Sequence, residues 1–166
     1  MSHFRVGVLI SSIILFGAGC ATPAQPVAAI VPPSYYTNIV KATKDNTDFR
    51  RVLFTGPNSQ LVIMNIPPGT EVGEETHKYA EQTLFFLSGT GEGMLGDKKF
   101  PIVAGDVVMV TAGTKHNFWN TGKNDLKIYT VYAPPNHIDG RVHHTKADAV
   151  ADVADEAVGE APPKIK

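Results

Sequence analysis

The residues best suited to chemistry in this sequence are two histidines and a glutamate that come from separate segments. Glu75 and His77 are two positions apart, so on an extended strand both side chains project from the same face. His116 belongs to a later predicted strand, which can bring its imidazole opposite the other two side chains. Two imidazoles and a carboxylate that converge in an apolar cavity would form a site for a divalent first-row metal ion.

The elements that must position these residues read as a run of short strands separated by turn residues. Gly96-Asp97 marks a tight hairpin, and the other boundaries fall at clusters of Gly, Pro, Ser, Thr and Asn. The predicted strands cover residues 51–55, 60–66, 83–87, 107–110, 116–120 and 126–132. This spacing predicts an all-β domain over residues 35–145, either a sandwich or a jelly-roll barrel that closes its own strand edges.

Two motifs, at residues 69–89 and 105–120, resemble the pair by which the cupin family is identified. Cupin motifs are usually written G-x5-H-x-H-x4-E-x6-G and G-x5-P-x-G-x2-H-x3-N. In this chain the template positions fall on Gly69, Glu75, His77, Gln82 and Gly89, and then on Gly105, Thr111, Gly113, His116 and Asn120. Every spacing is kept, and seven of the ten template residues are identical. The resemblance implies a cupin-type jelly-roll (double-stranded β-helix) barrel with a metal at the motif residues.

The implied ligand set differs from the usual one at two positions. Glu75 stands where cupins carry their first histidine, and Gln82 stands where they carry a glutamate. Glu81, one residue earlier, is an alternative to Gln82, and strand parity does not separate the two because both faces of this strand carry apolar side chains. We favour Gln82 and expect Glu75, His77, Gln82 and His116 to hold a divalent transition metal, namely iron, manganese, nickel or zinc.

The reaction stays open, because cupins with these two motifs perform many chemistries and some perform none. One hypothesis is a metal-dependent enzyme that acts on a small organic molecule, either an oxidoreductase of the dioxygenase type or an isomerase of the sugar-isomerase type. The alternative is a non-catalytic module that captures a small ligand, such as a carbohydrate, at the cell envelope. A third is a structural scaffold, often a homodimer in this family.

Composition excludes one class of partner. The chain has 15 Lys and Arg residues against 16 Asp and Glu residues, a formal net charge of −1. This balance leaves no basic excess to neutralise phosphates, so nucleic acid is not expected to be the main partner.

The N-terminal residues resemble a bacterial lipoprotein signal. Residues 1–19 have a short basic start, an apolar run and small residues, and Cys20, the single cysteine, follows at once. Gly17 stands where such signals usually carry leucine, which leaves plain secretion as the competing interpretation. We expect a signal peptide over 1–19, a lipid anchor at Cys20, an Ala/Pro-rich tether over 20–34 and a periplasmic location at the cell envelope.

Two further segments follow the last predicted strand. Residues 134–144 contain three histidines, and we favour a polar loop there over a contribution to a substrate or partner contact. Residues 146–166 are rich in Ala and acidic residues, with valines at loosely helical spacing. They predict a short C-terminal helix or tail, to which we assign no chemistry.

Overall fold

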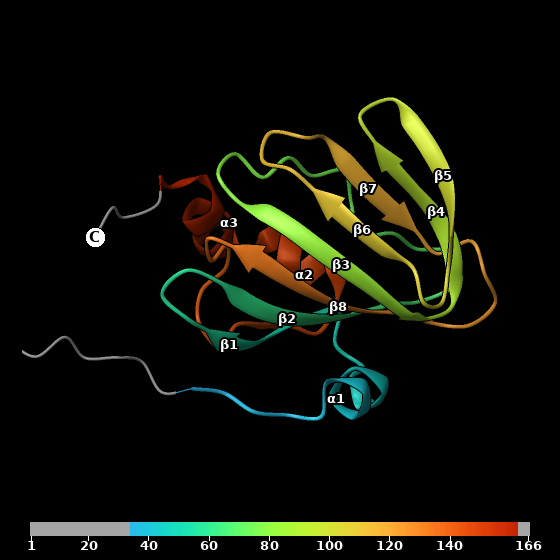
Figure 1. The fold of residues 1–166 in the computed structure, drawn as a ribbon, viewed down its shortest axis with the longest axis horizontal. Coiled ribbons are helices and arrows are strands. Elements are labelled where there is room, and N and C mark those ends of the chain that lie inside the picture. The colour runs from blue at the N-terminus through green and yellow to red at the C-terminus, as the bar shows by residue number, and fades with distance from the viewer. Residues whose placement is uncertain (1–33, 163–166) are drawn as a thin grey trace, which may run out of the picture. The chain divides into compact units, whose positions relative to one another are not determined.

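The computed structural model describes residues 34–162 of the chain. Strands make up most of the regular structure, and short helices precede and follow them (Figure 1). The elements in chain order are α1 (Ile39–Asp45), β1 (Arg50–Thr55), β2 (Gln60–Ile66), β3 (Glu81–Ser88), β4 (Thr90–Leu95), β5 (Lys98–Val103), β6 (Val107–Val110), β7 (His116–Trp119), β8 (Leu126–Ala133), β9 (Val142–His143), α2 (Lys146–Ala151) and α3 (Val153–Glu160). All six predicted strands are present, with bounds that differ by at most two residues.

The strands form two antiparallel sheets that face each other. The larger sheet has the order β6-β3-β8-β2-β1-β9, and the smaller has the order β5-β4-β7. Phe86 of the larger sheet meets Phe118 of the smaller one with ring centroids 5.4 Å apart, and both side chains belong to one buried hydrophobic cluster. The expected jelly-roll barrel is therefore confirmed, with its core between the two sheets.

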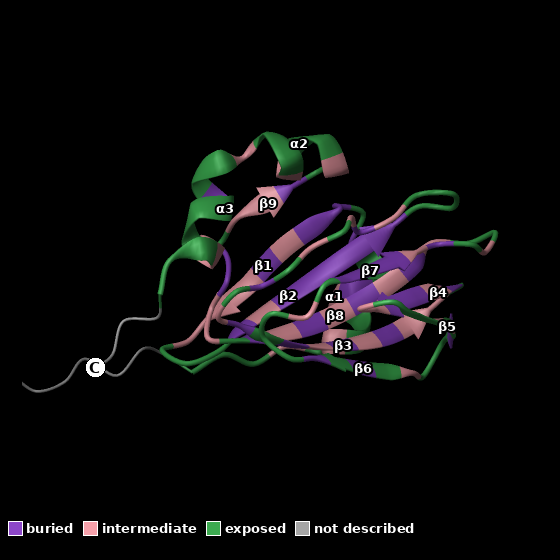
Figure 2. Ribbon diagram, turned by 90° about the horizontal axis from the view of Figure 1, so that it is seen from above, coloured by how far each residue is buried: buried purple, intermediate pink, exposed green. Residues whose placement is uncertain are grey.

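The central strands alternate between buried and partly exposed side chains. β3 and β8 pair so that Gln82 lies opposite Tyr132 and Phe86 lies opposite Ile128, and these four side chains are all at most 1% exposed. Figure 2 shows the alternation as purple and pink bands along both strands. Because side chains on a strand alternate with period two, this register sends Gln82 into the barrel along with the apolar core.

The segment between β2 and β3 lies alongside β7 without forming a regular strand. Isolated bridges join Glu71 to Trp119 and Glu75 to His116. The amide of Gly113, just before β7, donates to the carbonyl of His77 over 2.8 Å. The segment thus extends the smaller sheet beyond β7, and it is this irregular edge that carries the first two candidate ligands.

The C-terminal residues form two short helices that are fixed to the barrel. Thr145 and Asp148 make a reciprocal capping box at the start of α2, and Asp152 caps α3. Asp155 in α3 is fully buried, which is unusual for a carboxylate without a partner. The expected short C-terminal helix is confirmed, and one of its acidic residues, Asp155, enters the interior.

The N-terminal part of the described chain differs from the predicted structure. The barrel was expected from residue 35, whereas the first strand begins at Arg50 and is preceded by α1, which is capped by Asn38. α1 packs against β8, β2 and β3. The predicted signal peptide, Cys20 and the tether up to residue 33 lie outside the described residues. Among the helices within residues 34–162, none is long and apolar enough to cross a bilayer.

Gly89, the last glycine of the first motif, offers a test of the barrel's closure. Its φ is +89°, and a Cβ there would lie 2.7 Å from the Asp125 carbonyl oxygen and 2.8 Å from the Leu126 Cα. We expect Gly89→Ala to lower the free energy of unfolding by roughly 3 kcal/mol, from backbone strain and a clash with backbone atoms that cannot move aside. Gly96→Ala is the control, because Gly96 has φ +57° but open space around it, and it should cost only about 1 kcal/mol. Urea denaturation measures both, and equal losses would contradict the close approach.

Candidate metal centre

Glu75, His77 and His116 converge at one end of the barrel. Each offers one ligand atom, and these atoms all lie within 4.8 Å of one another. The backbones of Glu75 and His116 exchange two hydrogen bonds of 2.9 Å each, which fixes the two residues side by side. Metal bonds to nitrogen and oxygen are about 2.1 Å long, so an ion seated here would draw the three side chains slightly closer together.

His116 is held in the tautomer that binds metals. Its ring is fully buried, and its Nδ1 lies 2.8 Å from the backbone carbonyl of Thr114. A carbonyl can only accept, so the proton is on Nδ1 and Nε2 carries a free lone pair. Nε2 has no hydrogen-bond partner among residues 34–162, as expected of a ligand whose orientation is set by its other ring nitrogen.

His77 is oriented by a side chain from the loop after β8. The Asn136 amide lies 3.2 Å from its Nδ1, and the Asn136 backbone is held by the Gln60 side chain. A metal at Nε2 requires the proton on Nδ1, and the amide can accept it through its oxygen after a half-turn, since both orientations occupy the same space. Nε2 of His77 lies 3.5 Å from Oε2 of Glu75, and in the described part of the chain neither atom has a hydrogen-bond partner.

The structure shows which of Gln82 and Glu81 faces the interior. Gln82 is 1% exposed and donates from Nε2 to the Tyr132 hydroxyl over 2.8 Å, and the Tyr132 ring lies edge-on to that of His77. Its other amide atom, Oε1, is buried and has no partner among the described residues. Glu81 is exposed on the opposite face of β3 and is not part of the cluster. Of the two alternatives, the inward side chain is therefore Gln82.

The four candidate side chains share an energetically costly property. Each has one buried polar atom, a nitrogen or an oxygen, without a hydrogen bond to the described chain: Glu75 Oε2, His77 Nε2, Gln82 Oε1 and His116 Nε2. An unmet buried polar atom costs about 1–3 kcal/mol. All four are lone-pair donors, and a divalent cation would satisfy them together, so the residues present fit a bound metal ion.

Burial shifts the titration of the candidate ligands. Desolvation lowers the pKa of His77 to about 3, and repulsion from His116, His137 and Arg50 in their positively charged forms acts in the same direction. Desolvation likewise lowers the pKa of His116. Loss of water raises the pKa of Glu75, while Arg50 and Lys146 oppose that change. Both imidazoles are thus neutral near pH 7, the form in which they bind metals.

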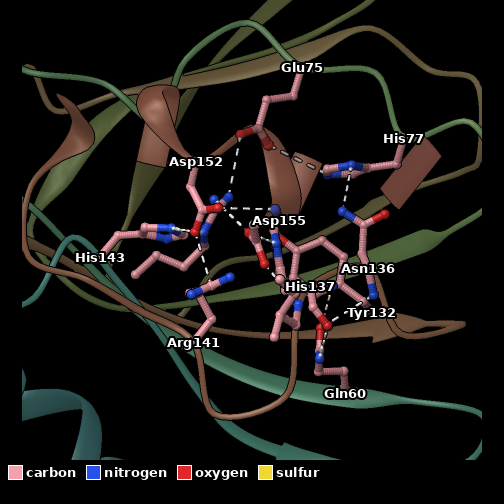
Figure 3. Close-up of polar contacts among 12 residues, drawn as sticks. Gln60, Glu75, His77, Tyr132, Asn136, His137, Arg141, His143, Asp152 and Asp155 are labelled. Atoms are coloured by element: carbon pink, nitrogen blue, oxygen red, sulfur yellow. Dashed lines mark hydrogen bonds and ion pairs between the residues drawn. The ribbon is translucent and has the colours of Figure 1, made fainter. Parts of the chain in front are cut away.

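A buried ion network, which the sequence did not reveal, adjoins these ligands (Figure 3). The Arg50 guanidinium lies 3.9 Å from Glu75 Oε1 and 3.3 Å from Asp155 Oδ2. Asp155 also accepts hydrogen bonds from His137 Nδ1 and the Ile138 amide. Since Arg50 and Asp155 are 105 residues apart, no local pattern could have predicted the contact.

The histidines of residues 134–144 do not share one environment. His137 and His143 are 6% and 3% exposed, so the favoured polar-loop interpretation is wrong for both. His143 pairs with Asp152, and His137 with Asp155. Only His144 has the exposed side chain expected of such a loop.

A cavity of about 320 Å³ reaches two of the four candidate ligands from outside the barrel. Glu75 and His77 line it together with Arg50, Asn136 and His137, and the facing wall consists of α2 and α3. A volume of this size admits a small organic molecule beside the ligand cluster.

Comparisons with known proteins cover the same part of the chain. A model of the cupin domain matches residues 62–132, which include all four candidate ligands. The Bacillus subtilis protein YrkC, itself uncharacterised, is 41% identical over 126 residues, which cover 72% of this chain and 68% of YrkC. The protein belongs to the cupin superfamily.

This cupin is also similar to a protein of known structure and to a protein with a named ligand. The crystal structure of BH2720 from Bacillus halodurans is similar with a TM-score of 0.71 and 38% identity, and the match covers 72% of this chain and 96% of that one. The oxalate-binding protein of Thermotoga maritima is 37% identical over 68 residues, which cover 41% of this cupin and 56% of that protein. Arg50, His137 and Asp155 lie outside the residues that match the cupin model.

The shifted histidines predict how the stability of the metal-free protein depends on pH. A histidine whose folded pKa is depressed takes up a proton on unfolding, so His77 lowers the free energy of unfolding as the pH falls from its ordinary 6.5 towards about 3. His116 and His137 act in the same direction, and Glu75, with its raised pKa, acts in the opposite one. Since three histidines oppose this one carboxyl group, we expect the free energy of unfolding to fall as the pH drops below 6.5, with His77 contributing up to about 1.4 kcal/mol per pH unit.

Urea denaturation in the presence of a chelator, at several values between pH 7.5 and pH 4.5, measures this slope. His77→Phe should make the slope shallower than that of the wild type. Stability that is constant or rises on acidification would show that the buried imidazoles are already charged in the folded state.

Proposed function

We propose that this cupin binds one divalent transition-metal ion through Glu75, His77 and His116, with Gln82 as a fourth donor, and uses it to hold a small organic molecule in the adjoining cavity. The observation that carries the proposal is the set of four buried lone-pair donors without hydrogen-bond partners among residues 34–162. The fixed tautomer of His116 supports it further. When bound, the ion would act as a Lewis acid on a ligand oxygen or, if it is redox-active, support oxidation.

The chain's own residues would perform the remaining tasks. Thr114 and Asn136 orient the two imidazoles, and the Arg50 guanidinium offsets part of the charge of the Glu75 carboxylate. The helices α2 and α3 cover the cavity and limit the access of water to it.

The first prediction of this proposal concerns metal content. The wild-type protein should bind close to one ion per chain after incubation with Fe²⁺, Mn²⁺, Ni²⁺ or Zn²⁺. His77→Ala and His116→Ala should lower the affinity by at least about 100-fold, because each removes a direct ligand, and Gln82→Leu should lower it by about tenfold. Metal analysis and isothermal titration calorimetry measure these changes.

Glu81→Gln is the matched control for Gln82, since Glu81 is adjacent in sequence but exposed, and it should bind the ion like the wild type. A wild-type protein that takes up none of the four metals would overturn the proposal. So would equal metal affinity in the wild type and in both histidine variants.

Turnover is the second question, and two classes of function compete for it. The first is a metal-dependent enzyme, an oxidoreductase of the dioxygenase type or an isomerase. The alternative is a non-catalytic binding protein. It is favoured by the similarity to the oxalate-binding protein of Thermotoga maritima and by an amide, Gln82, in place of a carboxylate. Oxygen uptake and product analysis with a panel of small acids and sugars separate the two, because binding without turnover supports only the second.

We further propose that the chain is exported and lipid-anchored at Cys20. The support is the order of a basic start, an apolar run and small residues directly before the single cysteine. In bacteria fed labelled palmitate, the full-length protein should incorporate label and fractionate with membranes, whereas Cys20→Ser should do neither. Labelling of the Cys20→Ser variant, or an unlabelled protein released as a soluble form, would contradict the anchor.

A further inference from the structure

Asp155 and His137 form a buried pair in the wall of the cavity. Asp155 Oδ2 lies 2.8 Å from His137 Nδ1, and Asp155 Oδ1 accepts the Ile138 amide over 2.7 Å. The carboxylate is completely buried. Burial alone would raise its pKa, but the hydrogen bond and charge of His137, the Ile138 amide and Arg50 lower that pKa to about 2. Asp155 is therefore an ionised acceptor fixed in one orientation.

This pairing determines which nitrogen of His137 is free. A carboxylate can only accept, so Nδ1 carries the proton and Nε2 presents a bare lone pair. Desolvation lowers the pKa of His137, against the effect of Asp155, so the ring stays neutral near pH 7. Nε2 is buried and has no hydrogen-bond partner within residues 34–162.

His137 shares its cavity with two of the metal-ligand candidates. Glu75, His77 and His137 all line it, and Figure 3 shows the three side chains in the region around Asp155. The cavity therefore offers a cluster of metal ligands and, separately, a neutral hydrogen-bond acceptor with no protein donor. The lining carries charges of both signs, because Arg50 and Lys146 face it together with Glu74, Glu156 and Glu160. A bound metal ion would therefore have to supply the main attraction for a carboxylate.

We propose that His137 is a ligand-binding residue whose Nε2 accepts a hydrogen bond from the hydroxyl group of a small hydroxy acid, and that Asp155 is the positioning residue that keeps Nε2 free. The inference rests on the proposed metal site, because the carboxylate of the acid would bind the ion. An ion held by Glu75, His77, Gln82 and His116 would act as a Lewis acid toward that carboxylate. A molecule with a carboxylate and an adjacent hydroxyl would satisfy the cation and the histidine together.

Glycolate and methoxyacetate provide matched probes, since they carry the same carboxylate but only glycolate has a hydroxyl proton. His137→Asn is the informative variant, because the asparagine amide can still donate to Asp155 from the position of Nδ1 while the acceptor at Nε2 is lost. We expect the ratio of glycolate to methoxyacetate affinity to fall about tenfold in metal-loaded His137→Asn relative to the metal-loaded wild type, as for the loss of one hydrogen bond. Titration calorimetry measures both affinities.

Metal affinity and methoxyacetate affinity should stay unchanged in His137→Asn, and His144→Asn, at an exposed site outside the cavity, should retain the full ratio. An unaltered ratio in His137→Asn, or no binding of glycolate by the metal-loaded wild type, would overturn this inference alone. Failure of the wild type to load metal would instead overturn the proposed function on which it rests.

The tautomer of His137 provides a second test, because a His137 that only stabilised the fold would not need an unprotonated Nε2. In ¹⁵N NMR spectra of the protein, the side chain of His137 should show a protonated Nδ1 and an unprotonated Nε2, and the Nε2 signal should shift when glycolate binds. In Asp155→Asn the acceptor at Nδ1 is replaced by an amide that can also donate, so the fixed tautomer and the glycolate preference should both be lost. A protonated Nε2 in the wild type would contradict the assignment.

Discussion

The pair of backbone hydrogen bonds between Glu75 and His116 is the constraint on which the site depends. These residues are far apart in sequence, and one of them lies on an irregular segment outside the strands. The bonds attach that segment to β7, so that a carboxylate and an imidazole enter the interior from neighbouring backbones. Strand periodicity then places Gln82 on the interior face of β3. On the irregular segment, His77 is held by the hydrogen bond from the Gly113 amide to its carbonyl.

A carboxylate in place of the usual first histidine changes the electrostatics of this cupin. Two neutral imidazoles, one carboxylate and one amide give the ligand set a charge of −1, and the partly buried Glu75 carboxylate loses hydration. Arg50 lies close enough to offset part of that cost, and Asp155 in turn balances Arg50. The network extends from the ligand cluster to the C-terminal helices, so the altered motif and the acidic end of the chain are parts of one charge balance.

Sequence reasoning was most successful where chemistry follows local spacing. The strands were predictable from apolar runs bounded by turn residues, and Glu75, His77 and His116 from the motif spacing. Parity could not choose between Gln82 and Glu81, because both faces of β3 carry apolar side chains; the choice depends on which face the second sheet covers. Arg50, His137 and Asp155 could not be found in this way, because their contacts depend on how α3 packs against the barrel, which no local pattern encodes.

The close approach of Gly159 in α3 to Asn136 connects the end of the chain to a ligand histidine. A Cβ on Gly159 would lie 2.9 Å from the Asn136 side chain, which in turn orients His77. Proteolytic trimming within α3 would remove Asp155, open one wall of the cavity and loosen Asn136, while the strands and their core would persist. Such a truncated preparation would still give the far-ultraviolet spectrum of a β protein yet bind ions poorly, so intact mass should accompany every measurement on purified material.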